Sequence, residues 1–411
     1  MTVDGAAAPE LVRRYVELGL RLGRHNPDIV DSYYGPVAWR DRISAEPVPA
    51  SAALVDEARR LIVDLDADAS SADHQLEIQQ RHWLRSQTVG LHTVARKLHG
   101  DDIGYLDEVE LCFGIRPEPI TEDEVHEAQR ALDRALRGPG GGVDASLADR
   151  TAALRDRHVV PVDRLRAVID NLADELRERT RLAFGLPDGE QITFDLVTDK
   201  PWSGFNVYQG NLRSLVTINT DLPVLATSIA HLVAHEAYPG HHTEGCHKEV
   251  GLVRGAHRVE QTIALIGTPA CLLAEGLADL GLEALVGTDT VSAVAPMLAD
   301  AGVNFEVEPV RAMSHFGEVM ARARGTLAIQ LHAEHRPVDE VIATAARWFV
   351  VDHARATQMV RFLTDPTWRA YVFCYAEGHR LCRAFMHGEP SRFARLLDEQ
   401  LTPADLYAGA A

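Results

Sequence analysis

The sequence predicts a mainly α protein with one small β element. Apolar residues recur every three or four positions through most of the 411 residues, as on one helical face at Leu11, Tyr15, Leu18 and Leu22. In a single region they alternate with a period of two instead. A hydrophobic fraction of 46% is enough for a substantial core. Further helices are predicted over residues 52–65, 76–98, 121–136, 162–184, 259–285, 304–333 and 367–386.

The β element is predicted between residues 191 and 220. The segments 191–198 and 213–220 are rich in Ile, Val, Thr and Phe and alternate with period two. Trp202-Ser203-Gly204 between them is typical of a turn.

A glycine-rich segment at Arg137–Ser146 predicts a flexible loop and the boundary between two parts of the chain. Residues 1–137 are then an N-terminal helical half, and residues 147–411 are the half that carries the chemistry described below. We expect the two to form one continuous structural unit.

Composition excludes several classes of function. Lys and Arg total 41 against 60 Asp and Glu, a formal charge of −19, so neither nucleic acid nor an anionic membrane is an expected partner. The N-terminus lacks a basic stretch followed by an apolar one, and no apolar run approaches the ~20 residues of a membrane span, which predicts a cytoplasmic protein. Five scattered cysteines without a CxxC pair predict no disulfide framework. The oligomeric state stays open.

The most informative run is His235-Glu236-Ala237-Tyr238-Pro239-Gly240-His241-His242. Neutral imidazoles hold a metal such as Zn²⁺, and an adjacent carboxylate that is not a ligand can take a proton from water. In the usual zinc-peptidase helix the two histidines stand at positions i and i+4. Here Pro239 stands at i+4.

A helix is expected to carry this run. Thr220 or Asp221 can cap it, and it would begin at Leu222 with Pro223 in its first turn. The apolar residues of this helix would form a buried stripe, and continuing their helical spacing places Glu236 on the same stripe. A buried carboxylate is costly without a partner, so Glu236 requires a metal, a cation or a reacting water nearby.

Pro239 should kink or stop the helix. On a straight helix His242 lies about 10 Å along the axis from His235, which is too far for a shared ion. A Pro-Gly bulge would instead bring His241 to the position of the second ligand. His241 is therefore the expected partner of His235, and His242 is held in reserve. The rival geometry is a regular pair of His231 and His235.

Glu275 is the expected third ligand. It lies in an apolar helical stretch with acids at 275, 279 and 283, which share one side at successive i+4 steps. Such a stripe is either a solvated face or a buried polar seam. The need of a zinc site for three protein ligands favours the seam.

These residues resemble the domain of unknown function 885 family, whose motif His-Glu-x-x-Pro-Gly-His-His is followed downstream by Glu-Gly. Further landmarks are Asp31-Ser32-Tyr33-Tyr34-Gly35-Pro36 and Tyr375 with Gly378. The resemblance covers most of the chain and implies a large helical, zinc-peptidase-like fold. It also implies that His235 and His241 are the metal pair, Glu236 the general base and Glu275 the acidic ligand.

Two positions depart from the family pattern. Leu277 stands where an aromatic residue usually follows Glu-Gly, and Glu244 stands where a Gln usually follows the double histidine. The first departure affects packing, and the second leaves the substrate preference open.

The sequence thus predicts a metal-dependent hydrolase that cleaves an amide or peptide bond. Glu236 would deprotonate the attacking water, and the phenol of Tyr375 would donate to the oxyanion, unless Tyr375 is a core residue. The substrate is expected to be a peptide or a small amide. The alternatives are a hydrolase of small non-peptide amides and a non-catalytic helical protein that binds metal.

Overall fold

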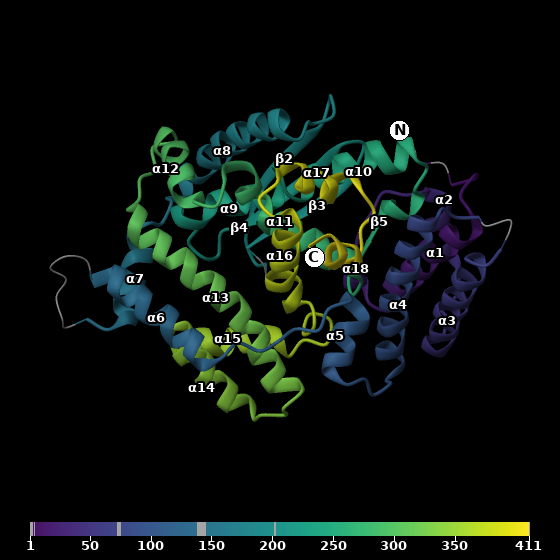
Figure 1. The fold of residues 1–411 in the computed structure, drawn as a ribbon, viewed down its shortest axis with the longest axis horizontal. Coiled ribbons are helices and arrows are strands. Elements are labelled where there is room, and N and C mark those ends of the chain that lie inside the picture. The colour runs from purple at the N-terminus through teal and green to yellow at the C-terminus, as the bar shows by residue number, and fades with distance from the viewer. Residues whose placement is uncertain (1–2, 4, 72–74, 138–144, 201–202, 411) are drawn as a thin grey trace.

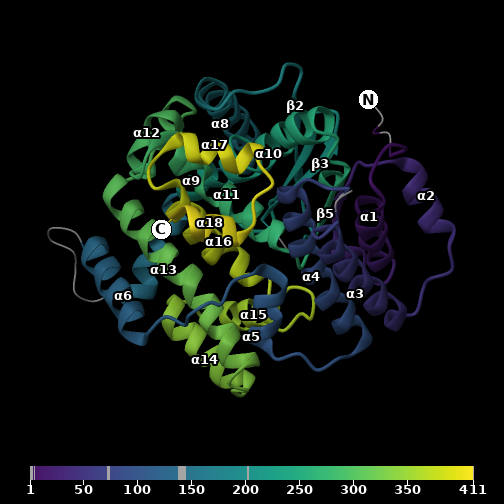
Figure 2. The ribbon, with the colours of Figure 1, turned by 45° about the vertical axis from the view of Figure 1, so that its right-hand side comes forward.

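The computed structural model describes residues 3, 5–71, 75–137, 145–200 and 203–410. Helices dominate these ranges, so the mainly α prediction is confirmed. Figures 1 and 2 show α1 to α4 grouped on one side and α6, α13 and α14 on another. The helices are α1 (Glu10–Gly23), α2 (Val37–Ala45), α3 (Ser51–Asp68), α4 (Ile78–His99), α5 (Tyr105–Phe113), α6 (Glu122–Arg137), α7 (Leu147–Arg157), α8 (Val162–Ala183), α9 (Ala226–Glu236), α10 (His241–Lys248), α11 (Pro269–Val286), α12 (Thr290–Asp300), α13 (Val307–His332), α14 (Val338–Phe349), α15 (His353–Leu363), α16 (Val372–Met386), α17 (Pro390–Asp398) and α18 (Pro403–Ala410).

The first hundred residues build an apolar cluster of their own. Its members lie on α1, α3 and α4, where the rings of Tyr15 and Trp83 meet edge to face at 5.9 Å. A later segment joins this cluster, because β5 (Ile263–Leu265) pairs antiparallel with β1 (Val30–Tyr33). The N-terminal helices are thereby tied to the chain just before α11.

A three-stranded sheet forms where the sequence predicted a β element. Its strands β2 (Gln191–Val197), β4 (Arg213–Asn219) and β3 (Gly204–Gly210) lie in that order. β2 runs parallel to β4, and β3 runs antiparallel to it. Apolar side chains of β2 and β4 pack with those of α8 and α9, so the sheet lies beside α9.

The turn predicted at Trp202-Ser203-Gly204 does not include its last residue. Gly204 is the first residue of β3 and pairs with Ile218 of β4, because the hydrogen-bonded ladder extends further than alternation of side chains indicates. Trp202 lies outside the described residues.

The loop and boundary predicted at Arg137–Ser146 remain a prediction. α6 ends at Arg137, and the hydroxyl of Ser146 caps α7. Residues 138–144 between them lie outside the described residues.

The start predicted for the motif helix was wrong. α9 begins at Ala226, and neither Thr220 nor Asp221 caps it. Leu225 instead bridges to Val159, and the carboxylate of Asp221 accepts the amide of Asp199 at 2.8 Å. Tertiary pairing therefore overrides the local capping signal. Leu222 and Pro223 precede the helix.

The helix predicted over residues 259–285 was also too long. Val259–Thr262 forms a 3-10 turn, Ile263–Leu265 is β5, and α11 begins only at Pro269. Gly267, at a φ of 82°, turns the chain between them. Because proline is favoured in the first turn of a helix, Pro269 marks the start of α11 and the end of the segment before it.

α11 and α16 pack with their backbones in contact. A Cβ on Gly276 would lie 2.3 Å from the carbonyl carbon of Gly378, so neither position has room for a side chain. This contact fixes α11 against the helix that carries Tyr375.

Within the described ranges no helix has both the length and the apolar character needed to cross a bilayer.

Candidate metal centre

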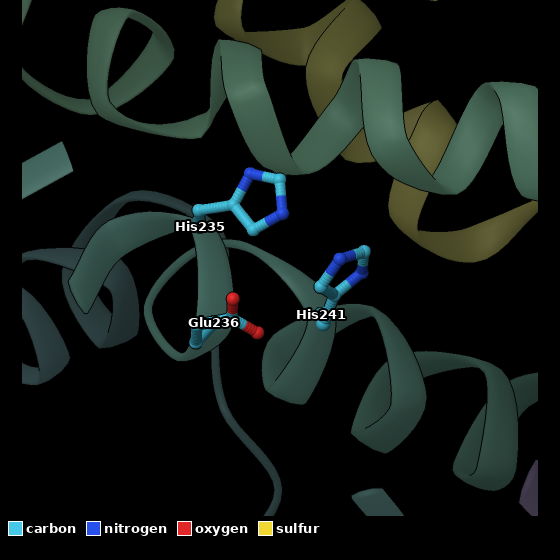
Figure 3. Close-up of side chains that lie close together, drawn as sticks. All are labelled: His235, Glu236 and His241. Atoms are coloured by element: carbon cyan, nitrogen blue, oxygen red, sulfur yellow. The ribbon is translucent and has the colours of Figure 1, made fainter. Parts of the chain in front are cut away.

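A break between two helices brings His235 and His241 together. α9 ends at Glu236 and α10 begins at His241, and the break between them contains Pro239. The two imidazole centroids are 4.7 Å apart and the rings are perpendicular. Figure 3 shows both rings and the carboxylate of Glu236 grouped at this break. The interruption predicted from Pro239 is therefore present, and it brings His241 beside His235.

Gly240 makes this close turn possible. Its amide donates to the carbonyl oxygen of Ala234 at 2.9 Å, which draws the start of α10 against the end of α9. A Cβ at this position would lie 1.9 Å from the carbonyl oxygen of His235. Side chains do not approach backbone atoms so closely, so the turn requires glycine.

His235 is oriented by two acids of α11. Its Nδ1 lies 2.8 Å from Oδ1 of Asp279, and its Nε2 lies 3.4 Å from Oε2 of Glu275. Glu275 and Asp279 are one helical turn apart, so they share a face. Burial lowers the pKa of His235, but Asp279 and Glu275 outweigh it and hold the pKa well above its usual value. The surroundings therefore favour positive charge at this point.

His241 approaches the same carboxylate from α10. Its Nε2 lies 3.8 Å from Oε1 of Glu275, and its Nδ1 lies 4.0 Å from Oε2 of Glu244. Burial alone would raise the pKa of Glu244, but Lys248 and His241 outweigh it and lower the pKa to about 2. Glu244 thus stays ionised on the Nδ1 side of the His241 ring.

Glu275 has one oxygen with a partner and one without. Oε1 accepts the hydroxyl of Tyr371 at 2.5 Å. Oε2 is buried and, among the described residues, has no hydrogen-bond partner. Buried polar atoms are normally satisfied, so this oxygen requires an explanation. The choice between a solvated acid face and a buried seam is decided for Glu275, which is 8% exposed.

The residues present fit a zinc ion. The residue types are the two imidazoles and one carboxylate of catalytic zinc sites, and Nε2 of His235 and Nε2 of His241 lie 3.4 Å and 3.8 Å from Oε2 and Oε1 of Glu275, respectively. The bond from Nδ1 of His235 to Asp279 is the usual outer support of a ligating histidine.

Glu236 lies in the same group. One ligand atom each from His235, Glu236 and His241 fall within 4.8 Å of one another. Its side chain is buried under Gly204 of β3, where a Cβ would come within 2.8 Å of Oε1. Burial raises the pKa of Glu236, although His235 and His241 oppose this. A carboxylate whose pKa is raised is a stronger base than an exposed one, which suits proton transfer.

His242, the reserve ligand, is directed elsewhere. It is fully buried, with Nδ1 2.8 Å from the hydroxyl of Ser214 and Nε2 2.9 Å from Oε2 of Glu190. Glu190 also accepts the hydroxyl of Tyr238 at 2.7 Å and pairs with Arg177. His242 therefore belongs to a hydrogen-bond network that connects α10 to the sheet.

Tyr375 contacts Tyr371, and Tyr371 in turn contacts Glu275. The rings of Tyr371 and Tyr375 meet edge to face at 5.6 Å, and Tyr375 is 38% exposed. It is therefore not a core residue. No pattern in the sequence singled out Tyr371, the residue before α16, whose hydroxyl bonds to Glu275.

Two more groups border the site. The ring of His231 lies 6.0 Å from that of His235, further than His241, and 51% of its side chain is exposed. Burial raises the pKa of Asp31 to about 6. His241 opposes this rise, and the negative charges of Glu275 and Glu236 add to it. Asp279 was visible in the sequence only as an acid one turn after Glu275, and that spacing was the available signal.

Comparison with known proteins identifies a related fold. No family model matches the chain. No curated protein matches it either. The chain is similar to the crystal structure of the "putative lipoprotein from Colwellia psychrerythraea", with a TM-score of 0.55 and 14% identity over 93% of this chain and 80% of that one. It is also similar to a "putative lipoprotein of unknown function from Shewanella oneidensis", with a TM-score of 0.48 and 15% identity over 96% of this chain and 83% of that one. The first of these shares the fold.

Proposed function

We propose that this chain is a zinc-dependent hydrolase that cleaves an amide or peptide bond. The observation that supports it most is the buried Oε2 of Glu275, which lacks a hydrogen-bond partner within the described ranges and lies 3.4 Å from Nε2 of His235. His235, His241 and Glu275 would hold the ion. When bound there, zinc would lower the pKa of a water and polarise the carbonyl that the water attacks.

Glu236 would carry the proton. Its carboxylate accepts a proton from the attacking water and later donates it to the nitrogen of the leaving amine. The raised pKa of Glu236, caused first by burial, supports this role because it makes the carboxylate a stronger base than an exposed one. The amide of Asn206 donates to the backbone carbonyl of Glu236 at 2.5 Å and steadies its position.

Tyr375 would stabilise the oxyanion. Its exposed phenol is free to meet a substrate, whereas the hydroxyl of Tyr371 is engaged by Glu275. A donor aimed at a developing negative charge acts most strongly where little water is present.

The test combines metal analysis with one substitution. Purified protein should contain about one zinc per chain, and the Glu236→Gln variant should retain zinc but lose turnover of a peptide library. The matched control is Glu283→Gln, an acid on α11 that pairs with Arg383. It should keep both properties. Full activity in Glu236→Gln would reject the mechanism.

The same experiment separates the alternatives. Turnover of small amides with no peptide cleaved would replace the peptide substrate by a small amide. Zinc that is needed for folding or partner binding, with Glu236→Gln silent in every assay, would indicate a non-catalytic metal-binding protein.

We also propose that the chain belongs to the domain of unknown function 885 family. The motif from His235 to His242 and the downstream Glu275-Gly276 support this assignment.

A further inference from the structure

A cavity of about 290 Å³ lies between the N-terminal helices and the start of α16. Its walls come mainly from α4, α5, the turn at residues 266–267 before α11 and the segment 366–370 before α16. α4 and α5 lie side by side there (Figure 1). No proposed metal ligand lines the cavity, so it is separate from the proposed metal centre. Its size suits a small molecule, because ligand sites begin at about 300 Å³.

A buried ion cluster forms part of the cavity wall. The carboxylate of Glu108 on α5 is fully buried and has a cation on each oxygen. Its Oε1 pairs with Nζ of Lys97 from α4, and its Oε2 accepts Nε of Arg369 at 3.0 Å. The other acid on the wall, Asp101, pairs with Arg96 at 2.8 Å and does not offset these cations. The wall therefore carries one positive charge in excess.

Three groups of the wall keep donors that the described residues do not use. Nζ of Lys97 uses two of its three hydrogens, for the buried carboxylate and for the carbonyl oxygen of Pro366 at 2.9 Å. Nη1 of Arg369 has no hydrogen-bond partner among the described residues. The hydroxyl of Thr367 accepts the amide of Asn26 at 2.9 Å, and its own proton has no acceptor within the described ranges.

The arginine of this cluster is held in place by α5. The guanidinium of Arg369 lies over the ring of Tyr105, 5.7 Å from the centroid, and the hydroxyl of Tyr105 donates to the carbonyl oxygen of Arg369 at 2.6 Å. A donor fixed in advance loses little freedom when a ligand binds. The rest of the wall is largely apolar, with side chains such as Ile29, Val94 and Ile266.

We propose that this cavity binds the carboxylate of a small organic acid, whose apolar part lies against the apolar wall. One positive charge in excess matches a monoanion, whereas a phosphate monoester carries nearly two negative charges at neutral pH. The planar guanidinium of Arg369 suits the two oxygens of a carboxylate. A local excess of positive charge also attracts an anion to a chain whose net charge is −19. The site goes beyond the proposed function and does not depend on it.

Four probes with one apolar chain and different head groups test this site: hexanoate, hexanamide, hexylammonium and hexyl phosphate. Their dissociation constants are measured by ligand-observed nuclear magnetic resonance on the full chain. Hexanoate should bind at least about 10-fold tighter than hexanamide, because hydrogen bonds to a charged group are stronger than neutral ones. Hexylammonium should not bind, since its charge has the sign of the excess on the wall.

Two variants place the binding in this cavity. Lys97→Met removes the excess charge while keeping a long side chain, so the preference for hexanoate over hexanamide should disappear. Thr367→Val keeps every charge and should weaken hexanoate binding about 3- to 10-fold, and it decides the matter should Lys97→Met fail to fold. The control Arg85→Met removes the same charge from α4 at an exposed pair with Asp66 and should change nothing.

Equal binding of hexanoate and hexanamide, or binding of neither, would overturn the proposal. Hexanoate binding that neither variant weakens would also overturn it, because the acid would then lie elsewhere, for example on a zinc ion. Hexyl phosphate that binds tighter than hexanoate would reject the assignment to a carboxylate. The proposed hydrolase function is tested separately by zinc content and turnover, and each proposal can fail without the other.

Discussion

Tyr371 and Glu275 are joined by a hydrogen bond of 2.5 Å from the phenol hydroxyl to Oε1. The bond crosses from the start of α16 to α11, whose backbones touch. It occupies one carboxylate oxygen and leaves Oε2 facing Nε2 of His235. The protein thus selects which oxygen of Glu275 is available.

Removing this bond should weaken metal binding. The Tyr371→Phe variant keeps the ring but loses the hydroxyl, so the affinity for zinc should fall about 10- to 100-fold. Competition with a chelator of known affinity measures it. Tyr375→Phe is the matched control and should keep the affinity while turnover falls, since Tyr375 is assigned to the oxyanion. Equal zinc affinity in Tyr371→Phe and wild type would contradict the role given to this bond.

Asp279 should matter for zinc although it is not a proposed ligand. In Asp279→Asn the partner of Nδ1 of His235 loses its charge, so the ring is a weaker base and is less firmly oriented. Zinc affinity should fall about 10- to 100-fold. Glu283→Gln, one turn further along α11, should leave it unchanged. An Asp279→Asn protein with wild-type affinity would show that the pair is only a packing contact.

Gly240→Ala should disrupt the turn that joins α9 to α10. The new Cβ would overlap the carbonyl oxygen of His235, so the chain must move, at a cost of about 2 kcal/mol or more in the free energy of unfolding. Gly317→Ala is the control, because nothing lies within 4 Å of a Cβ there on α13. It should stabilise the protein by about 0.5–1 kcal/mol. Urea unfolding compares the two, and equal stabilities would refute this account of Gly240.

Glu190 should make stability depend on pH in the acid range. Burial would raise its pKa, but hydrogen bonds from His242, Tyr238 and Arg177 outweigh it and lower the pKa to about 2. Because the pKa of this carboxyl is lower in the folded than in the unfolded protein, its ionised form stabilises the fold. This stabilisation is complete above the pKa of the unfolded state and is lost as the pH falls toward 2.

The unfolding free energies of wild type and Glu190→Gln should therefore differ less at low pH. From pH 5 to pH 3 the difference should narrow by on the order of 2 kcal/mol, measured by urea unfolding at each pH. Glu178→Gln, on the exposed face of α8, serves as the control and should show little narrowing. A constant difference for Glu190→Gln would mean that its carboxylate is not held ionised.

The sequence predicted much of the site because its signals are local. Pro239 must interrupt a helix, and the distance from His235 to His242 on a straight helix favours His241, which is the residue that the structure brings beside His235. The spacing of 275 and 279 put both acids on one face. Such deductions require only helical geometry.

The errors arose where distant parts of the chain decide the outcome. The start of α9 depends on the bridge from Leu225 to Val159, and the segment at Ile263–Leu265 is a strand only because β1 lies beside it. Tyr371 reaches Glu275 because two glycines let α11 and α16 approach. No periodicity in the sequence encodes these encounters.

The contact of Gly276 with Gly378 has a consequence for mutational tolerance. Each glycine excludes a side chain on the other, so replacing both at once cannot compensate for replacing one. Saturation mutagenesis with a selection for folded protein should return glycine at both positions and no substituted pair. The two positions should thus be as intolerant as a catalytic residue, although neither carries any chemistry.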